Sequence, residues 1–319
     1  MAERLRQAGS LLLVTHARPD GDGLGSMAAL ARAARAAGKG AHLLVPDNIP
    51  PRYRFLFPDD KPAGDRQFTS LASQADLVVI LDTSAFAQLD DLDEELRRRR
   101  GQLVVIDHHA IGDDLTDAAW IDSTAAATGV MLGELLEELG WPLDPQAAEA
   151  LLAAITTDTG WLRFANTDAR CLRQVARLIE AGARMDHLYH TLYQADRPER
   201  LALLSRALAG MELHCEKRLA VMKLRKSDFA ETRAATMETE NFVNQGLRIG
   251  SVEASVMLVE NDDAIRVSLR SRDSVDVAEI ARSLGGGGHR RAAGVRLDPP
   301  LDNVKQRIIH AVAHALGQL

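Results

Sequence analysis

The sequence predicts an α/β protein in which a parallel sheet with helices on both faces is followed by a smaller α/β unit. In the first half, continuous apolar runs alternate with helical stretches, as in buried parallel strands joined by helices. After Ser123 the pattern becomes helical, and strand-like segments return in the last third. With 319 residues, 46% of them apolar, the chain can form two domains with separate cores.

The elements of the first half follow one another as strand, helix and strand. Apolar runs predict strands at residues 9–16, 41–46, 77–82 and 103–107. Helical patterns cover residues 25–39, 128–140, 145–160, 168–182 and 197–211. Because the strands are continuously apolar, we expect helices on both faces of their sheet.

The last third of the chain predicts a sheet of its own. Adjacent strand-like segments at 211–217 and 218–224 open this unit, and further strands are expected at 252–260 and 264–271. A final helix is expected after Pro300. The mixture of strands and helices predicts a second α/β domain.

A charged segment at 194–206 separates the two patterns and is expected to form a connecting helix. We therefore place the first domain at residues 1–190, the connecting helix or linker at 191–207 and the second domain at 208–319.

Composition and charge exclude several classes of protein. The formal net charge of −7 argues against a broad basic surface for long nucleic acid. No apolar stretch approaches the roughly 20 residues that cross a bilayer, and the N-terminus lacks a signal-peptide pattern, so we expect a cytoplasmic protein without membrane contact. Cys171 and Cys215 are far apart, which argues against a disulfide framework or a thiolate metal site.

Acidic residues and histidines gather where the predicted strands end. They are His16, Asp20 and Asp22 after the first strand, Asp82 at the end of the third, and Asp107, His108 and His109 at the end of the fourth. A further acid, Asp158, ends an apolar helical stretch. The carboxyl ends of parallel strands share one edge of the sheet, where ligands bind in open α/β folds. We therefore expect these side chains to meet.

This set of side chains predicts a metal centre. Carboxylate oxygens with imidazole suit magnesium or manganese, and the histidines favour manganese. The candidate ligands outnumber those that one ion needs, which indicates two ions that bind the attacking and leaving oxygens of a phosphoryl group. We expect Gly21, Gly23 and Gly25 to let the loop curl around the ions. For any single motif, a helix N-cap or an ordinary turn is the competing explanation.

Five motifs resemble those of a known family. THARPDGDGLGS at 15–26, LDTS at 81–84, DHHA at 107–110 and TDTG at 157–160 resemble the four motifs of the DHH phosphoesterases. GGGGHRRAAG at 285–294 resembles the signature of the DHH-associated C-terminal domain. The resemblance covers nearly the whole chain, and its length is similar to that of the stand-alone nanoRNases, which also dephosphorylate 3′-phosphoadenosine-5′-phosphate (pAp).

The resemblance implies a role for each residue of the metal centre. It implies one manganese ion on His16, Asp20 and Asp82, and a second on Asp22, Asp82, His108 and Asp158, with Asp82 as the bridge. It also implies that Asp107 orients the histidine ligands and that His109 faces the substrate phosphate or the leaving group.

The run Gly285–Gly288, followed by His289, has two interpretations: a flexible linker, or a backbone that approaches a phosphate. The apolar AAGV segment that follows favours the phosphate cradle. The resemblance implies that Gly286, Gly287, Gly288 and His289, with an arginine of the preceding strand, bind the terminal phosphate of the substrate. Arg270 is the candidate, and Arg266 and Arg272 compete with it.

The resemblance implies a manganese-dependent hydrolase, with magnesium as the alternative metal and the substrate in a cleft between the domains. We expect it to cleave short single-stranded oligoribonucleotides and dinucleotides to mononucleotides, and pAp to AMP. A cyclic di-AMP or linear dinucleotide phosphodiesterase is the alternative enzyme. A catalytically inactive nucleotide-binding module is the alternative of another class. The oligomeric state, including a homodimer, stays open.

Overall fold

A computed structural model describes residues 1–319 except 90–91, 111, 273–274 and 318–319. The chain forms two compact units, Met1–Ala195 and Asp196–Leu319, and each is described by itself. Both units are α/β, which confirms the predicted fold class. No helix in the described part of the chain has the length and apolar character that crossing a bilayer requires.

A five-stranded parallel sheet forms the centre of the N-terminal unit. Its strands are β1 (Ser10–Thr15), β2 (Gly40–Leu44), β3 (Leu77–Leu81), β4 (Leu103–Asp107) and β5 (Ala119–Ile121), in the order β2-β1-β3-β4-β5. All neighbouring strands are parallel. Strand β5 was not predicted, because it is short and its outer residues are exposed, so it leaves no apolar run.

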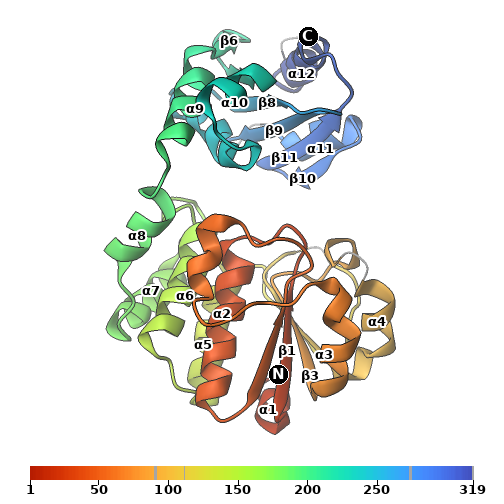
Figure 1. Ribbon diagram of the computed structural model, residues 1–319, viewed down its shortest axis with the longest axis vertical. Coiled ribbons are helices and arrows are strands. Elements are labelled where there is room, and N and C mark those ends of the chain that lie inside the picture. The colour runs from red at the N-terminus through yellow and green to blue at the C-terminus, as the bar shows by residue number, and fades with distance from the viewer. Residues whose placement is uncertain (90–91, 111, 273–274, 318–319) are drawn as a thin grey trace. The chain divides into compact units, whose positions relative to one another are not determined.

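Helices cover both faces of this sheet, as predicted (Figure 1). On one face, Leu11 and Leu13 of β1 join a core with α2 (Gly21–Ala36), α5 (Thr128–Leu139) and α6 (Pro145–Asp158). On the other face, Leu12 and Val14 join a core with α3 (Phe68–Gln74) and α4 (Asp93–Arg98). Alternate residues of a strand point to opposite faces, so this strand is buried on both sides.

The remaining elements of this unit are short or peripheral. They are α1 (Ala2–Gln7), α7 (Ala169–Glu180), α8 (Met185–Tyr193) and the 3₁₀ turns η1 (Pro51–Leu56), η2 (Asp65–Gln67), η3 (Phe86–Gln88) and η5 (Arg100–Gln102).

Helix α2 begins at Gly21, four residues before the predicted start, so the expectation of a glycine loop around the metal is wrong. Asp20 caps the helix, since its Oδ1 accepts hydrogen bonds from the N–H groups of Asp22 and Gly23. The glycines instead permit close packing. A Cβ at Gly25 would lie 2.4 Å from the carbonyl oxygen of Ala150 in α6.

A six-stranded mixed sheet forms the centre of the C-terminal unit. Its strands are β6 (Glu212–His214), β7 (Leu219–Leu224), β8 (Ala254–Glu260), β9 (Ile265–Ser271), β10 (Gly287–His289) and β11 (Ala292–Leu297). Their order is β10-β11-β9-β8-β7-β6, and only β7 and β8 pair in parallel.

Two groups of helices pack on this sheet (Figure 1). One face packs against α11 (Val277–Ser283) and α12 (Leu301–Ala315). The other packs, over β7 and β8, against α9 (Pro198–Ala209), α10 (Lys226–Thr232) and η7 (Phe242–Arg248), with η6 (Thr236–Thr239) beside them.

Candidate metal centre

The strand order places the predicted metal ligands at the point where successive connections leave β1 toward opposite sides of the sheet. From β1 the chain continues to β2 on one side, whereas β3 lies on the other side of β1. The loops after β1 and β3 therefore diverge and leave a crevice at the carboxyl edge, which is the usual ligand site of such sheets. His16, Asp20 and Asp22 follow β1, and Asp82 follows β3.

Asp82 lies between two groups of candidate ligands. On one side, His16 Nε2 is 3.5 Å from Asp82 Oδ2 and 3.6 Å from Asp20 Oδ1. On the other side, His108 Nε2 is 3.5 Å from Asp82 Oδ1. The two oxygens of one carboxylate thus face two different histidines, an arrangement suited to a ligand shared by two cations.

Asp22 and Asp158 complete the group around His108. Its Nε2 lies 3.8 Å from Asp22 Oδ2 and 3.6 Å from Asp158 Oδ2. Asp22 lies in the first turn of α2 and Asp158 is the last residue of α6. The structure therefore brings together all six residues predicted to be metal ligands.

Hydrogen bonds orient both of these histidine rings. His16 Nδ1 lies 3.0 Å from the carbonyl oxygen of Ala17, and His108 Nδ1 lies 3.3 Å from that of Ala125. A carbonyl only accepts, so Nδ1 carries the hydrogen in each ring. The Nε2 lone pair of a neutral ring then faces the carboxylates, as in a metal-ligating histidine.

The electrostatics of the cluster fit a divalent cation. Burial disfavours the charged His16 ring, but Asp20 and Asp82 outweigh it and raise its pKa to about 11. Burial, together with the charges of Asp82 and Asp158, raises the pKa of Asp22 well above its usual range. Burial also raises the pKa of Asp158 to about 7, although His108 opposes the shift. Carboxylates this crowded need a cation to stay ionised together.

The N-terminus of α5 holds two of the carboxylates. The backbone N–H of Thr128 donates to Asp22 Oδ2 at 2.6 Å, and that of Gly129 donates to Asp22 Oδ1 at 2.9 Å. The hydroxyl of Thr128 donates to Asp82 Oδ1 at 3.0 Å. Thr128 was not among the predicted site residues, because it lies 106 residues from Asp22 and carries no local motif.

The backbone of Asp82 is in the left-handed region, with φ of +64°. Its N–H still donates to the carbonyl of Ile106, at 3.0 Å. Left-handed backbone is costly for most residues with a Cβ, and aspartate tolerates it better than most. Such a conformation occurs often at functional sites, where surrounding contacts hold the residue.

His109 has a different environment from the other two histidines. Its Nδ1 is 2.7 Å from Oδ1 of the fully buried Asp107, and this hydrogen bond raises the pKa of His109 to about 9. Ser84 donates to Asp107 Oδ2, also at 2.7 Å. Because the Nδ1 hydrogen is directed at Asp107, this nitrogen is not available to a metal. Ser84 lies within the LDTS motif, but its contact was not predicted.

The predicted phosphate-binding residues lie on neighbouring strands of the C-terminal sheet. His289 pairs with Ala292, which pairs with Arg270, so the three positions form one row across β10, β11 and β9. The side chain of His289 lies outside the described part of the structure. Of the competing arginines, Arg272 donates to three backbone carbonyls. Arg266 donates to Thr239.

The glycine run is not a linker, because Gly287 and Gly288 belong to β10. A Cβ at Gly286 would lie 2.3 Å from the carbonyl oxygen of Gly294. Gly288 has a φ of +140°, and a Cβ there would lie 2.5 Å from the carbonyl oxygen of Ala292. This hairpin therefore requires glycine at both positions.

Relatives are found along nearly the whole chain. Residues 10–155 match the family model "DHH family, N-terminal domain", and residues 217–318 match the "DHHA1 domain". A Thermus thermophilus protein named "Bifunctional oligoribonuclease and PAP phosphatase NrnA" is 32% identical over 97% of this chain and 90% of that protein. A Bacillus subtilis protein of the same name is 28% identical over 90% of this chain and 89% of that protein.

Solved structures share the fold. An exopolyphosphatase-related protein from Bacteroides fragilis has a TM-score of 0.93 at 22% identity, covering 98% of this chain and 94% of that one. An exonuclease RecJ bound to manganese has a TM-score of 0.56 at 16% identity, covering 100% of this chain and 95% of that one. With a family match in each unit and a relative at 32% identity, this chain belongs to the DHH family.

Proposed function

We propose that this protein is a manganese-dependent phosphoesterase that hydrolyses short oligoribonucleotides and dinucleotides to mononucleotides, and pAp to AMP. The observation that carries the proposal is the position of Asp82, whose two carboxylate oxygens face His16 and His108 separately. The names of the Thermus thermophilus and Bacillus subtilis relatives, bifunctional oligoribonuclease and PAP phosphatase, supply the substrate class.

The donor set supports two divalent cations. His16, Asp20 and Asp82 would hold one, and Asp22, Asp82, His108 and Asp158 would hold the other. When bound, the cations supply an activated water and neutralise charge on the phosphoryl oxygens. Imidazole among hard oxygen ligands favours manganese over magnesium, and the RecJ structure with the same fold contains manganese.

His109 would assist the leaving oxygen of the substrate. Asp107 fixes the ring through Nδ1 and favours its protonated form, as the pKa of about 9 indicates. A ring that keeps its proton at neutral pH can donate it to an alkoxide as the ester bond breaks. Asp107 acts as a positioning residue, and Ser84 holds its second oxygen.

Arg270, His289 and the backbone of Gly286–Gly288 would bind a terminal phosphate of the substrate. Arg270 is half-buried, and burial lowers its pKa, while the charge of Glu240 opposes the shift. Its Nη1 donates to the carbonyl of Leu269. Gly286 and Gly288 bring the β10 backbone close to β11.

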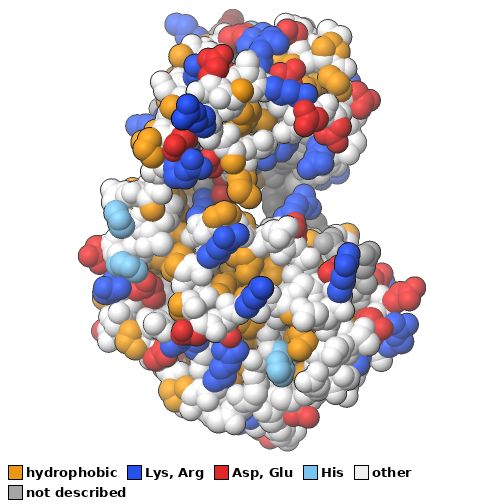
Figure 2. Space-filling view, in the orientation of Figure 1, with side chains coloured by type: hydrophobic (Ala, Val, Ile, Leu, Met, Phe, Trp, Pro, Cys, Tyr) orange, Lys and Arg blue, Asp and Glu red, His pale blue; other side chains and the backbone are white. Residues whose placement is uncertain are grey.

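The substrates proposed here are short and single-stranded. The net charge of −7 disfavours long nucleic acid, and Lys and Arg side chains are interspersed with Asp and Glu on the visible face of each unit (Figure 2). A cytoplasmic location and a homodimer stay predictions, which cell fractionation and light scattering respectively would test.

A length series tests the proposal. We would incubate 5′-labelled RNAs of about two to 24 nucleotides, pAp and cyclic di-AMP with the protein in manganese, magnesium or EDTA. We expect manganese-dependent release of mononucleotides that falls steeply with length, and AMP from pAp. The Asp82→Asn variant should lose at least about 100-fold in rate, because it removes the shared carboxylate.

The same assay separates the alternatives. Preference for cyclic di-AMP would replace the proposal with a cyclic-dinucleotide phosphodiesterase. Binding of these nucleotides without turnover in any metal would indicate a binding module. Equal cleavage of long and short RNA would contradict the length limit.

A further inference from the structure

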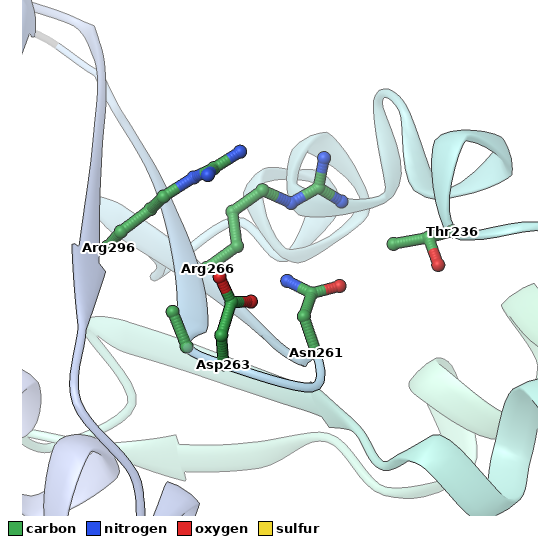
Figure 3. A pocket seen from close by; sticks show the side chains of 6 residues that line it. Thr236, Asn261, Asp263, Arg266 and Arg296 are labelled. Carbon is green, nitrogen blue, oxygen red and sulfur yellow. The ribbon is translucent and has the colours of Figure 1, made fainter.

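A second group of polar side chains lies in the C-terminal unit, around the turn between β8 and β9. These side chains line a surface pocket of about 130 Å³. The lining residues are Thr236, Asn261, Asp263, Ala264, Arg266 and Arg296 (Figure 3). Among the described residues, none of the predicted metal ligands lines this pocket, and neither do Arg270 or the glycines of residues 286–288; Arg266, which competes with Arg270 in the sequence-based prediction, does.

Arg266 and Arg296 are directly opposite each other on the antiparallel strands β9 and β11. Figure 3 shows both arginine side chains among the lining residues, with Asp263 and Asn261 drawn below Arg266. Like charges at directly opposite positions repel. The acid that lines the pocket, Asp263, supplies only one charge against two. Glu240 also acts on Arg266 through its charge, but the pocket itself is lined by two guanidinium groups and one carboxylate.

Arg266 also has a donor without a partner. Its Nη2 donates to Thr239, but its buried Nε has no hydrogen-bond partner in the described structure. Buried donors in proteins are nearly always satisfied, and an orphan one points to a bound group or water. Burial, followed by the charge of Arg296, lowers the pKa of Arg266, while Glu240 opposes the shift. A bound oxyanion would accept a hydrogen bond from the Arg266 Nε, and its negative charge would reduce the repulsion between the two guanidinium groups.

We propose that Arg266 and Arg296 bind a phosphate group, with Asn261 and Thr236 as further hydrogen-bonding groups. The guanidinium fork matches phosphate oxygens in a bidentate manner. The phosphate has two conceivable sources, an internucleotide phosphate of the substrate or a free phosphate-bearing metabolite. The first source rests on the function proposed above.

The face of β9 favours the substrate as the source. Arg266, Ser268 and Arg270 alternate with fully buried apolar residues, so they share one face of the strand. Four residues of strand separate the two arginines by about 13 Å. The residues between them on this face are small: Ser268 of β9 and Gly294 of β11, which pair with each other. An oligonucleotide with one phosphate at Arg270 would thus reach Arg266 only if it were longer than a dinucleotide.

Binding measurements on the full chain test the pocket. We would compare wild type, the Arg266→Gln/Arg296→Gln double variant and Arg282→Gln, an exposed arginine of α11 on the other face of the sheet. Labelled dinucleotide, labelled tetranucleotide and inorganic phosphate would each be titrated in EDTA, where no hydrolysis occurs. Unchanged circular dichroism and dinucleotide affinity would show that the double variant is folded.

We expect the double variant to bind the tetranucleotide at least about tenfold more weakly, with the dinucleotide affected less than twofold. That result assigns the pocket to an internucleotide phosphate. Loss of inorganic phosphate binding without an effect on the tetranucleotide supports a free phosphate compound. If the double variant matched Arg282→Gln for every ligand, the pocket would not be a phosphate site. Because binding is measured without turnover, a failure of RNA hydrolysis in the length series would overturn the proposed function and not this pocket.

Discussion

Asp82 shows how single residues set up the centre. Its left-handed backbone turns the chain after β3, and its two oxygens face His16 and His108. The hydroxyl of Thr128 donates a hydrogen bond to Asp82 Oδ1, and the backbone N–H of Thr128 donates to Asp22 Oδ2. One residue at the start of α5 therefore positions carboxylates from two different motifs.

Replacing Thr128 should weaken metal binding without unfolding the protein. Thr128→Val keeps the shape of the side chain but removes the hydroxyl that donates to Asp82. We expect manganese affinity to fall by about 10- to 100-fold, as for other groups that orient metal ligands. Isothermal titration with manganese would measure the change. Thr128→Ser retains the hydroxyl and should bind manganese nearly as wild type does; equal loss in both variants would contradict this role.

At the scale of elements, the packing of α2 against α6 brings Asp22 and Asp158 to one centre. Gly25 lies at this contact, where an added Cβ would meet the Ala150 carbonyl oxygen at 2.4 Å. A backbone atom cannot rotate away as a side chain can. The two helices would have to separate, and the carboxylates with them.

Gly25→Ala should therefore lower the free energy of unfolding by about 2–3 kcal/mol. Helix propensity alone predicts the opposite sign, since alanine is about 1 kcal/mol better than glycine within a helix. Urea denaturation would measure the difference. Gly64→Ala is the matched control, because its added Cβ would meet nothing within 4 Å; a stable Gly25→Ala variant would show that the helices can adjust.

Arg170 joins three segments of the N-terminal unit. From α7 it donates through Nε and Nη2 to the two carboxylate oxygens of Glu134 in α5, and through Nη1 to Asp122 after β5, each at 2.6 Å. The hydroxyl of Thr124, followed by Arg170, lowers the pKa of Asp122 to about 2. This bidentate, partly buried network should contribute more than an ordinary surface pair.

Arg170→Met should destabilise the protein by about 1–2 kcal/mol at neutral pH. The folded-state pKa of Asp122 lies below the ordinary aspartate value of 3.8, so its stabilisation is present above that pH and is lost as pH falls toward 2. The difference between wild type and variant should shrink over that range. Urea denaturation as a function of pH would measure it. Arg177→Met, which breaks an exposed pair with Glu137, should change the free energy of unfolding much less than Arg170→Met does.

For the whole molecule, metal binding should be linked to folding. A cation that binds only the folded protein at 100 times its Kd adds about 2.7 kcal/mol, or roughly 5–10 °C in Tm for a unit of this size. We expect manganese to raise the Tm of wild type by that amount and EDTA to reverse it. Differential scanning calorimetry would record both.

Asp82→Asn is the control for this linkage. It removes one negative charge from the crowded carboxylates, so in EDTA it should melt at or above the wild-type temperature. In manganese it should show little increase in Tm, because the shared ligand is lost. A full manganese shift in this variant would contradict the assigned ligand set.

Sequence alone determined the main strands and the six candidate ligands. Runs such as Leu11–Val14 are apolar at every position, as a strand buried on both faces requires. Acidic residues that follow parallel strands lie at the same edge of the sheet. These signals are local, so they can be read in one stretch of chain.

Tertiary structure alone decided the contacts between distant segments. The hydrogen bonds from Thr128 to Asp22 and Asp82 and the pairing of Arg266 with Arg296 depend on them. The exposed strand β5 depends on its neighbour β4 in the same way. Such features arise from strand register and helix packing across many residues of sequence, which leave no periodic pattern in the segments themselves.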